Sequence, residues 1–453
     1  MIRLFALAIW LASLFAFVCF PGFNAYSQSK GEEVDELRKR MEELEREYRS
    51  KMEELRSRIE ELEGEREREE KDGWWKRIEV EYKKPGDGFT IKTEDSNFKL
   101  RTRLRAQIQF SVNDTEGEDT ATDFNLRRFR VTWDGNAFRP WLLYKFQISG
   151  DNNGNFQLRD AYLDFAYNTL FVPRPGQFKV PFSREELTSS SELQLVERSI
   201  VNEEFALGRD RGTAIYGVLG NYIVYGAGVF NGDGRNGSSA DSNLLYAGRI
   251  MLTPCCGELK YGGDFPAGGD YKIEPNFGER DRPLIAIGAA VAGIPGLNIG
   301  RKTPDSNIDE RFGEIFGGDV IAAGNAEADV ISFTADANFK YWIFSLEGEY
   351  HIRNIDPKEG GFKKVTDQGF RVQSGLFVAP EFMEVAGRFA YIDFDDDVDG
   401  RDSRWEITPG LNLYLSKSHK YKLQFSYSFI RDEDTDGQKF DQNVFLTQLQ
   451  AYF

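Results

Sequence analysis

Residues 98–112 of this chain read FKLRTRLRAQIQFSV, and their side chains alternate between two kinds. Leu104 and Ile108 lie on the apolar side of a period-2 pattern, whereas Arg101, Arg103 and Arg105 share the polar side. An extended run of this length, at about 3.3 Å per residue, reaches about 50 Å and exceeds most strands of globular proteins. The stretch therefore predicts one strand of an outer-membrane β-barrel, apolar toward lipid and cationic toward a water-filled lumen.

The composition agrees with a barrel. The chain has 453 residues, of which 14% are aromatic and 44 are glycine, yet its mean hydropathy is only -0.50. Outer-membrane barrels have such values because lipid-facing and lumen-facing residues alternate and cancel. The net charge of -17 argues against a nucleic-acid partner. It does not set the sign of a pore, since 18 acidic and 11 basic residues fall between residues 31 and 72.

The first 27 residues have the features of a secretory signal. Arg3 precedes an apolar core, and Ala25, Tyr26 and Ser27 form a small-residue cleavage site. No other apolar run approaches the roughly 20 residues of a membrane helix, so we expect the mature protein to cross a membrane as strands. Outside this leader the adjacent Cys255 and Cys256 are the only cysteines, which predicts neither a disulfide framework nor a spaced metal site.

Residues 31–71 have a different periodicity. Nine apolar residues recur there at steps of three and four in a background of Glu, Arg and Lys: Val34, Leu37, Met41, Leu44, Tyr48, Met52, Leu55, Ile59 and Leu62. This spacing predicts an oligomeric coiled coil, with one stutter between Tyr48 and Met52. Residues 72–97 form a junction that contains the turn sequence KKPGDG.

Residues 98–453 contain sixteen strand candidates, an even number that suits a closed antiparallel bacterial barrel. They lie near 98–112, 124–136, 141–150, 156–168, 170–178, 211–220, 222–231, 243–253, 283–293, 328–339, 341–353, 368–379, 381–394, 404–416, 420–431 and 440–453. Long acidic links alternate with short ones, as external loops alternate with periplasmic turns. Residues 254–282 break this rhythm and represent either an insertion or a missed hairpin.

Several runs resemble the phosphate-selective porin O/P family: NFKLRTRLRAQIQF, FNLRRFRVTWDGN, LRDAYLDF, GQFKVPFSREELTSS, ERSIVNEEFALGRDRG and YGAGVFNGDGRN. The resemblance covers residues 98–235 and continues through the strand pattern to the terminal Phe453. It implies a trimeric porin of sixteen strands whose third external loop folds into the lumen, where inward arginines and lysines hold the anion. Arg103 and the pair Arg127 and Arg128 match the pore arginines of the family.

The alternation itself indicates a similar set. Arg128 and Arg130 share the polar face of the second strand, so Arg127 should point outward unless a bulge turns it inward. Arginine suits an oxyanion because its planar fork stays charged and offers fixed donors. A ring of such charges in a narrow pore selects anions. The alternative interpretation is a solvated polar face of a sheet.

The connection 179–210 is far longer than ordinary hairpin loops and is therefore expected to be functional. We predict that it forms the constriction, with six charged residues as candidates: Lys179, Arg184, Glu185, Glu186, Arg198 and Arg209. Phosphate-selective relatives have a lysine before the TSS segment where this chain has two glutamates. The sequence thus supports anions more strongly than phosphate.

Other functions have weaker support. The only histidines, His351 and His419, match no nucleophile arrangement, so we expect no enzyme and no cofactor. The acidic run at 393–402 lacks the terminal glutamate of a calcium loop, and no metal site is expected. The favoured interpretation is a homotrimeric outer-membrane anion porin with a periplasmic coiled coil. The competing one is a structural envelope protein whose barrel anchors a coiled coil that tethers the membrane to peptidoglycan.

Overall fold

The computed structural model describes residues 29–71, 78–82, 86–150, 154–220, 222–237, 242–253, 271, 273–277, 282–299, 308–324 and 326–453. The chain divides into two compact units, residues 1–77 and 78–453. The predicted leader and the Cys255–Cys256 pair lie outside the described residues. No helix within the described ranges is both long and apolar enough to cross a membrane.

The first unit contains one long helix, α2 (Ser29–Lys71). Its charged side chains pair along the helix surface, as Lys51 does with Glu47 at 2.8 Å. The apolar stripe predicted as a seam stays exposed, with Leu37 at 61% and Leu44 at 64% of full exposure. The helix is therefore present, and its association with other helices remains a prediction.

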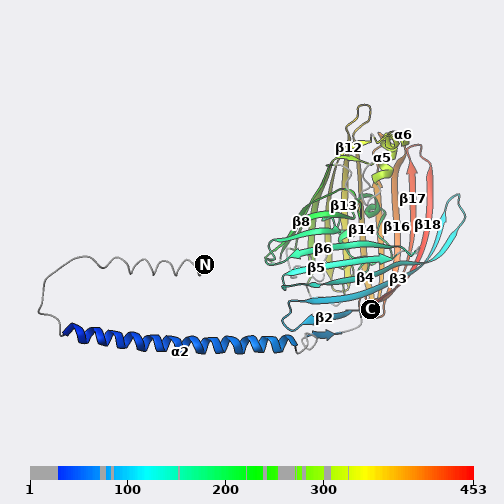
Figure 1. Ribbon diagram of the computed structural model, residues 1–453. Coiled ribbons are helices and arrows are strands. Elements are labelled where there is room, and N and C mark those ends of the chain that lie inside the picture. Colours follow the sequence, from blue (N-terminus) through cyan, green and yellow to red (C-terminus); the bar gives the residue numbers. More distant parts are fainter. Residues whose placement is uncertain are drawn as a thin grey trace. The chain divides into compact units, whose positions relative to one another are not determined.

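The second unit is a closed antiparallel barrel, which confirms the predicted fold class (Figure 1). Each strand pairs with its neighbours in the chain, and the last strand pairs with the first; at this closure Phe453 and Leu104 exchange backbone hydrogen bonds of 3.0 and 3.2 Å. The sixteen strands are β3 (Lys99–Thr115), β4 (Ala121–Asn136), β5 (Leu142–Gly150), β6 (Phe156–Phe165), β7 (Val172–Lys179), β8 (Arg209–Leu219), β9 (Ile223–Phe230), β10 (Leu245–Leu252), β11 (Leu284–Asn298), β12 (Glu327–Tyr341), β13 (Phe344–Pro357), β14 (Val365–Ala379), β15 (Met383–Asp393), β16 (Arg401–Tyr414), β17 (Tyr421–Asp434) and β18 (Lys439–Tyr452).

The barrel wall has a polar inside and an apolar outside. Along β12 the buried and exposed positions alternate: Asp336 and Lys340 are buried, whereas Ile331 and Phe333 are nearly half exposed. A soluble sandwich would bury the apolar set, but a barrel in lipid exposes it. The period-2 pattern therefore fixes which side chains line the lumen.

Two short strands precede the barrel in the segment expected to be a junction. β1 (Ile78–Glu81) pairs with β2 (Phe89–Thr93), and β2 extends the sheet along the start of β3. Gly88 permits this close approach, since it has a φ of +73° and a Cβ there would lie 2.1 Å from the carbonyl oxygen of Thr102. Sheet pairing in this unit thus begins before residue 98.

The long connection 254–282 adds no strand to the barrel wall between β10 and β11, because these two strands pair directly with each other. Of its described residues, Tyr271 and Glu274 are buried. A Glu274 carboxylate oxygen accepts hydrogen bonds from the backbone nitrogen of Gln194 at 2.7 Å and from the side chain of Gln373 at 2.8 Å. This part of the insertion therefore reaches the loop 179–210 and the inner face of β14.

Two helices that the sequence analysis did not predict lie between β11 and β12, α5 (Ile308–Phe316) and α6 (Gly318–Ala322) (Figure 1). Phe312 of α5 belongs to the same buried apolar cluster as Val330 and Ile355 of the barrel wall. Arg311 forms an ion pair with Asp367 of β14 at 2.9 Å. These contacts hold α5 against the ends of β12 to β14.

Candidate functional site

The arginines of β3 and β4 lie side by side on the inner face of the barrel. Arg105 pairs across the strands with Arg130, and both side chains are buried. Like charges placed opposite each other destabilise a sheet, and burial increases that cost. The arrangement therefore requires anions nearby, either from the chain or from solution.

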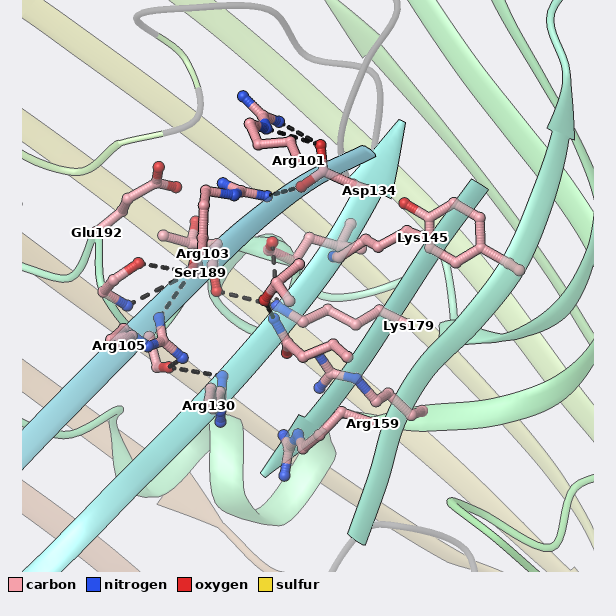
Figure 2. A pocket seen from close by; sticks show the side chains of 18 of the residues that line it. Arg101, Arg103, Arg105, Arg130, Asp134, Lys145, Arg159, Lys179, Ser189 and Glu192 are labelled. Carbon is pink, nitrogen blue, oxygen red and sulfur yellow. Dashed lines mark hydrogen bonds and ion pairs between the residues drawn. The ribbon is translucent and has the colours of Figure 1, made fainter. Parts of the chain in front are cut away.

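Part of this charge is balanced within the barrel wall. Asp134 of β4 accepts hydrogen bonds from Arg101, at 2.9 Å from its Nε, and from Arg103 (Figure 2). Because one carboxylate serves two guanidinium groups, this group of three residues keeps a net positive charge.

A β-bulge changes the orientation of Arg127. The pairing of β3 with β4 shifts between Gln107 and Gln109, so the strand carries an extra residue there. Arg127 and Arg128 consequently reach the same carboxylate, that of Glu197, each at 2.7 Å. The expectation that Arg127 points outward in a regular strand thus does not apply, because the bulge that would turn it inward is present.

The loop 179–210 lies inside the barrel and contacts several wall strands. It contains two short helices, α3 (Arg184–Leu187) and α4 (Ile200–Phe205). Glu185 pairs with Arg371 of β14 at 3.0 Å, and Glu204 pairs with Arg353 of β13 at 2.6 Å. On another side, the hydroxyl of Ser190 accepts hydrogen bonds of 3.2 Å from Arg105 of β3 and Arg130 of β4. The loop therefore crosses the lumen between these strands.

The predicted cations of the loop mainly hold its own backbone. Lys179 donates hydrogen bonds to the carbonyls of Leu187 and Thr188, and Arg198 donates to the carbonyls of Glu185 and Thr188. Burial alone would raise the pKa of the Glu186 carboxyl, but the charges of Arg198, Lys179 and Arg209 lower it to about 2. The carboxylate of Glu186 is thus a fixed counter-charge within the loop.

The remaining two loop candidates contact the barrel wall. Arg184 approaches Glu347 of β13 at 3.4 Å, and its backbone nitrogen donates to Glu349 at 2.7 Å. Arg209, at the start of β8, pairs with Asp160 of β6 at 2.7 Å. Arg184, Glu185 and Arg209 therefore form ion pairs with the wall strands. Four of the six predicted residues, Lys179, Arg184, Arg198 and Arg209, also line the cavity described next.

A cavity of about 430 Å³ lies between the loop and the wall of β3 to β6 (Figure 2). Twelve lysine and arginine side chains line it against three carboxylates. Among the described residues, no carboxylate lies within ion-pair distance of the exposed Lys99 or of three lining arginines, Arg105, Arg130 and Arg159, which we call the arginine triad. Burying unpaired charge is costly, so the triad is poised to bind an anion.

Arg159 was not among the residues chosen from the sequence. In regular alternation it would point away from the buried Asp160 and Tyr162, but the register of β5 with β6 shifts between Gln147 and Ile148. This irregularity places Arg159 in the cavity lining. The run LRDAYLDF contains no local signal of the bulge, so the alternation rule could not find this residue.

The hydroxyl groups of Ser189, Ser190 and Ser191 lie beside the arginine triad. Arg105 donates to Ser189 at 3.4 Å, and the hydroxyl of Tyr452 in β18 donates to Ser191 at 2.7 Å. Hydroxyl groups both accept from guanidinium and donate to oxyanions. They can therefore hold the arginines in place and still contact a passing anion.

One of the two histidines, His351, contributes to the packing of the loop. His351 of β13 is buried, its ring stacks on Phe205 with 5.5 Å between centroids, and its Nε2 lies 3.3 Å from Glu349. The Glu349 carboxylate also accepts a hydrogen bond of 3.0 Å from the backbone nitrogen of Glu185. His351 is thus part of the contact that fixes the loop.

Comparisons with known proteins agree with this architecture. A family model described as phosphate-selective porin O and P matches residues 98–453. An uncharacterized protein of Aquifex aeolicus is 24% identical over 407 residues, which cover 80% of this chain and 89% of that protein.

Solved structures with a similar fold include an anion-selective porin from Comamonas acidovorans (TM-score 0.53, 12% identity, 78% of this chain and 99% of that chain). The outer membrane channel DcaP of Acinetobacter baumannii is also similar (TM-score 0.51, 12% identity, covering 78% of this chain and 97% of that chain). At these identities the likeness concerns the fold alone.

Proposed function

The chain belongs to the phosphate-selective porin O and P family and is an outer-membrane porin, and from this premise we propose that it conducts small anions by passive diffusion through the arginine-lined lumen. The observation that carries the proposal is the arginine triad, Arg105, Arg130 and Arg159, which borders the cavity without a carboxylate partner among the described residues. Membership of a porin family makes the protein a channel and not an enzyme.

The residues have distinct roles in this mechanism. Arg101 and Arg103, half balanced by Asp134, attract anions without binding them tightly. At the triad an anion exchanges part of its hydration shell for guanidinium donors, and the loop 179–210 narrows the path so that this contact is unavoidable. Binding there must stay weak enough for the anion to leave.

Tetrahedral oxyanions suit the triad better than halides. Guanidinium groups present paired donors that match the oxygens of phosphate or sulfate, and Ser189 and Ser190 add hydroxyl groups at the same place. Phosphate is therefore included among the proposed permeant anions. Residues Glu185 and Glu186 do not oppose this, since both are engaged by cations of the chain.

Reversal potentials in a salt gradient across a planar bilayer test the proposal, followed by conductance with phosphate, sulfate and chloride. We expect a reversal potential of the sign that anion preference gives, and saturating conductance with the oxyanions. A preference for cations would contradict the mechanism. The absence of conductance would instead favour the structural envelope protein that tethers the membrane to peptidoglycan.

We further propose that the protein is a homotrimer joined by a parallel coiled coil of α2 in the periplasm, after removal of residues 1–27. In the predicted heptads Arg40 and Arg58 precede the seam residues Met41 and Ile59, and Glu45 and Glu63 follow five residues later. This spacing lets opposite charges of parallel neighbouring helices meet in register. The exposed stripe would then be buried between copies.

The barrel offers a second argument for association. Strands β7, β9 and β10 have only 8 residues each. At about 3.3 Å per residue and a tilt of about 40°, such strands span about 20 Å, less than the roughly 25 Å of the apolar membrane layer. A neighbouring copy against this short wall would relieve the mismatch.

A further inference from the structure

We propose that Glu197 determines the anion specificity of this porin by acting as a tethered carboxylate that occupies the arginine pair of β4. The inference rests on the proposed anion conduction and adds a feature to it. The positions that resemble the pore arginines of the family, Arg127 and Arg128, hold an anion of the chain itself. The permeating ion is left with the arginine triad as its binding site.

The geometry at Glu197 is that of a bound carboxylate. One oxygen lies 2.7 Å from the Nε of Arg127 and the other lies 2.7 Å from a terminal nitrogen of Arg128. The other terminal nitrogen of Arg128 donates a third hydrogen bond at 3.3 Å, and the side-chain amide of Gln109 donates a fourth at 3.2 Å. Two arginine forks and an amide around one carboxylate are the contacts that a free oxyanion would otherwise make.

Glu197 is held in this position from the opposite direction. Arg388 of β15 donates hydrogen bonds to the backbone carbonyls of Glu197 and Arg198, at 3.0 and 3.1 Å. The backbone is therefore fixed independently of the carboxylate. A neutral side chain at residue 197 should therefore leave the loop in place, so a substitution there tests the carboxylate charge separately from the loop structure.

The carboxylate is charged under all ordinary conditions. Burial would raise the pKa of Glu197, but Arg128 and Arg127 hold it well below its usual value. The group of Arg127, Arg128 and Glu197 thus has a net charge of +1. Without the carboxylate it would have +2 and two free forks, which would form a second anion site along the same lumen.

The bulge in β4 determines how many arginines Glu197 engages. If β4 were regular, Arg127 would face outward and Glu197 would balance Arg128 alone. Because the bulge brings both arginines to one carboxylate, the group stays cationic while that carboxylate engages the Nε of Arg127 and both terminal nitrogens of Arg128. Glu197 therefore lowers the number of anions bound in the pore without reversing the charge of the path.

The experiment compares four forms of the full-length protein in planar bilayers: wild type, Glu197→Gln, Arg127→Gln and the double variant. Their net charges at this group are +1, +2, 0 and +1. We expect the ratio of anion to cation permeability to rise between roughly twofold and tenfold in Glu197→Gln, the range of one charge acting across several ångströms of a wet pore. It should fall in Arg127→Gln and return toward wild type in the double variant.

Phosphate concentration series give the second readout. Glu197→Gln should show an added binding phase in the saturation of conductance, because the released forks are free. An unchanged permeability ratio in Glu197→Gln, in a wild type that prefers anions, would overturn the role of Glu197 alone. A wild type that prefers cations would overturn both proposals. If Glu197→Gln fails to fold, a permeability ratio in Arg127→Gln equal to wild type would also overturn the inference.

Discussion

Replacing Arg159 with glutamine should weaken anion binding and, in the absence of anions, stabilise the barrel. Arg159 lines the cavity with Arg105 and Arg130, and no described carboxylate lies within ion-pair distance of it. Its charge is therefore useful only when an anion is present. Removing it relieves the repulsion on Arg130 but takes away one of the three guanidinium groups of the site.

The size of the binding effect follows from the hydrogen bonds lost. A hydrogen bond to a charged group contributes about 1.5–3 kcal/mol, so the dissociation constant for sulfate or phosphate should increase roughly 10- to 150-fold. At 100 times the wild-type dissociation constant, the anion stabilises the folded state by about 2.7 kcal/mol. A tenfold weaker site would retain about 1.4 kcal/mol at the same concentration.

Thermal unfolding of the detergent-solubilised protein, followed across a sulfate titration, measures this difference. Arg139→Gln is the matched control, because it removes the same charge from an exposed turn between β4 and β5. We expect the unfolding temperature of Arg159→Gln to start higher than that of wild type and to rise less with sulfate. Equal responses to sulfate in wild type and Arg159→Gln would refute the assignment of Arg159 to the anion site.

The other predictions concern the loop and the coiled coil. Arg371→Met removes three ion pairs, including that with Glu185 at 3.0 Å. We expect the free energy of unfolding to fall by about 3–5 kcal/mol and the single-channel conductance to rise, because the loop is held less firmly in the lumen. An unchanged conductance would show that Arg371 does not hold the loop in place. Because the pKa of Glu186 is lowered from 4.5 to about 2, its ion pairs are fully present above pH 4.5 and are lost as the pH falls through 2. The part of the conductance change that a Glu186→Gln variant abolishes should therefore lie below about pH 4.5, and a change between pH 5 and 7 that this variant abolishes would contradict the assignment. The double variant Leu44→Glu, Leu55→Glu should shift the mass of the detergent-solubilised particle toward that of the monomer, or make the trimer dissociate at a higher protein concentration than wild type does. An intact trimer of wild-type stability would show that the apolar seam is dispensable for assembly.

Much of the fold was predictable because lipid imposes a strict rule on every strand. All sixteen predicted strands are present, and the alternation also gives the side that faces the lumen. Strand ends were less certain: β11 continues past residue 293 to Asn298 through an irregularity near Ile294. The hairpin of β1 and β2 was not predicted, although the turn sequence KKPGDG lies between the two strands, because its place in the sheet depends on pairing with the edge of β3.

The site was predictable only where the strands are regular. The period-2 alternation of side chains predicted that Arg105 and Arg130 face the lumen. Arg159 lies at a register shift between β5 and β6, which the alternation cannot predict. Glu197 was missed for another reason, since its partners are about seventy residues away in the sequence. The sequence of a long loop has no periodicity, so it does not show which strand of the barrel a loop carboxylate will contact.

In the proposed mechanism, the two bulges together decide where an anion can bind. One brings Arg127 beside Arg128, where Glu197 engages both; the other brings Arg159 beside Arg130, where no described carboxylate follows. Each bulge adds an inward arginine that a regular strand would turn toward lipid, where a charge is costly. The distribution of free positive charge in the lumen therefore depends on two local irregularities and one loop carboxylate, and not on the number of arginines. This is why the count of arginines in residues 98–112 predicts an anion pore but cannot locate its binding site.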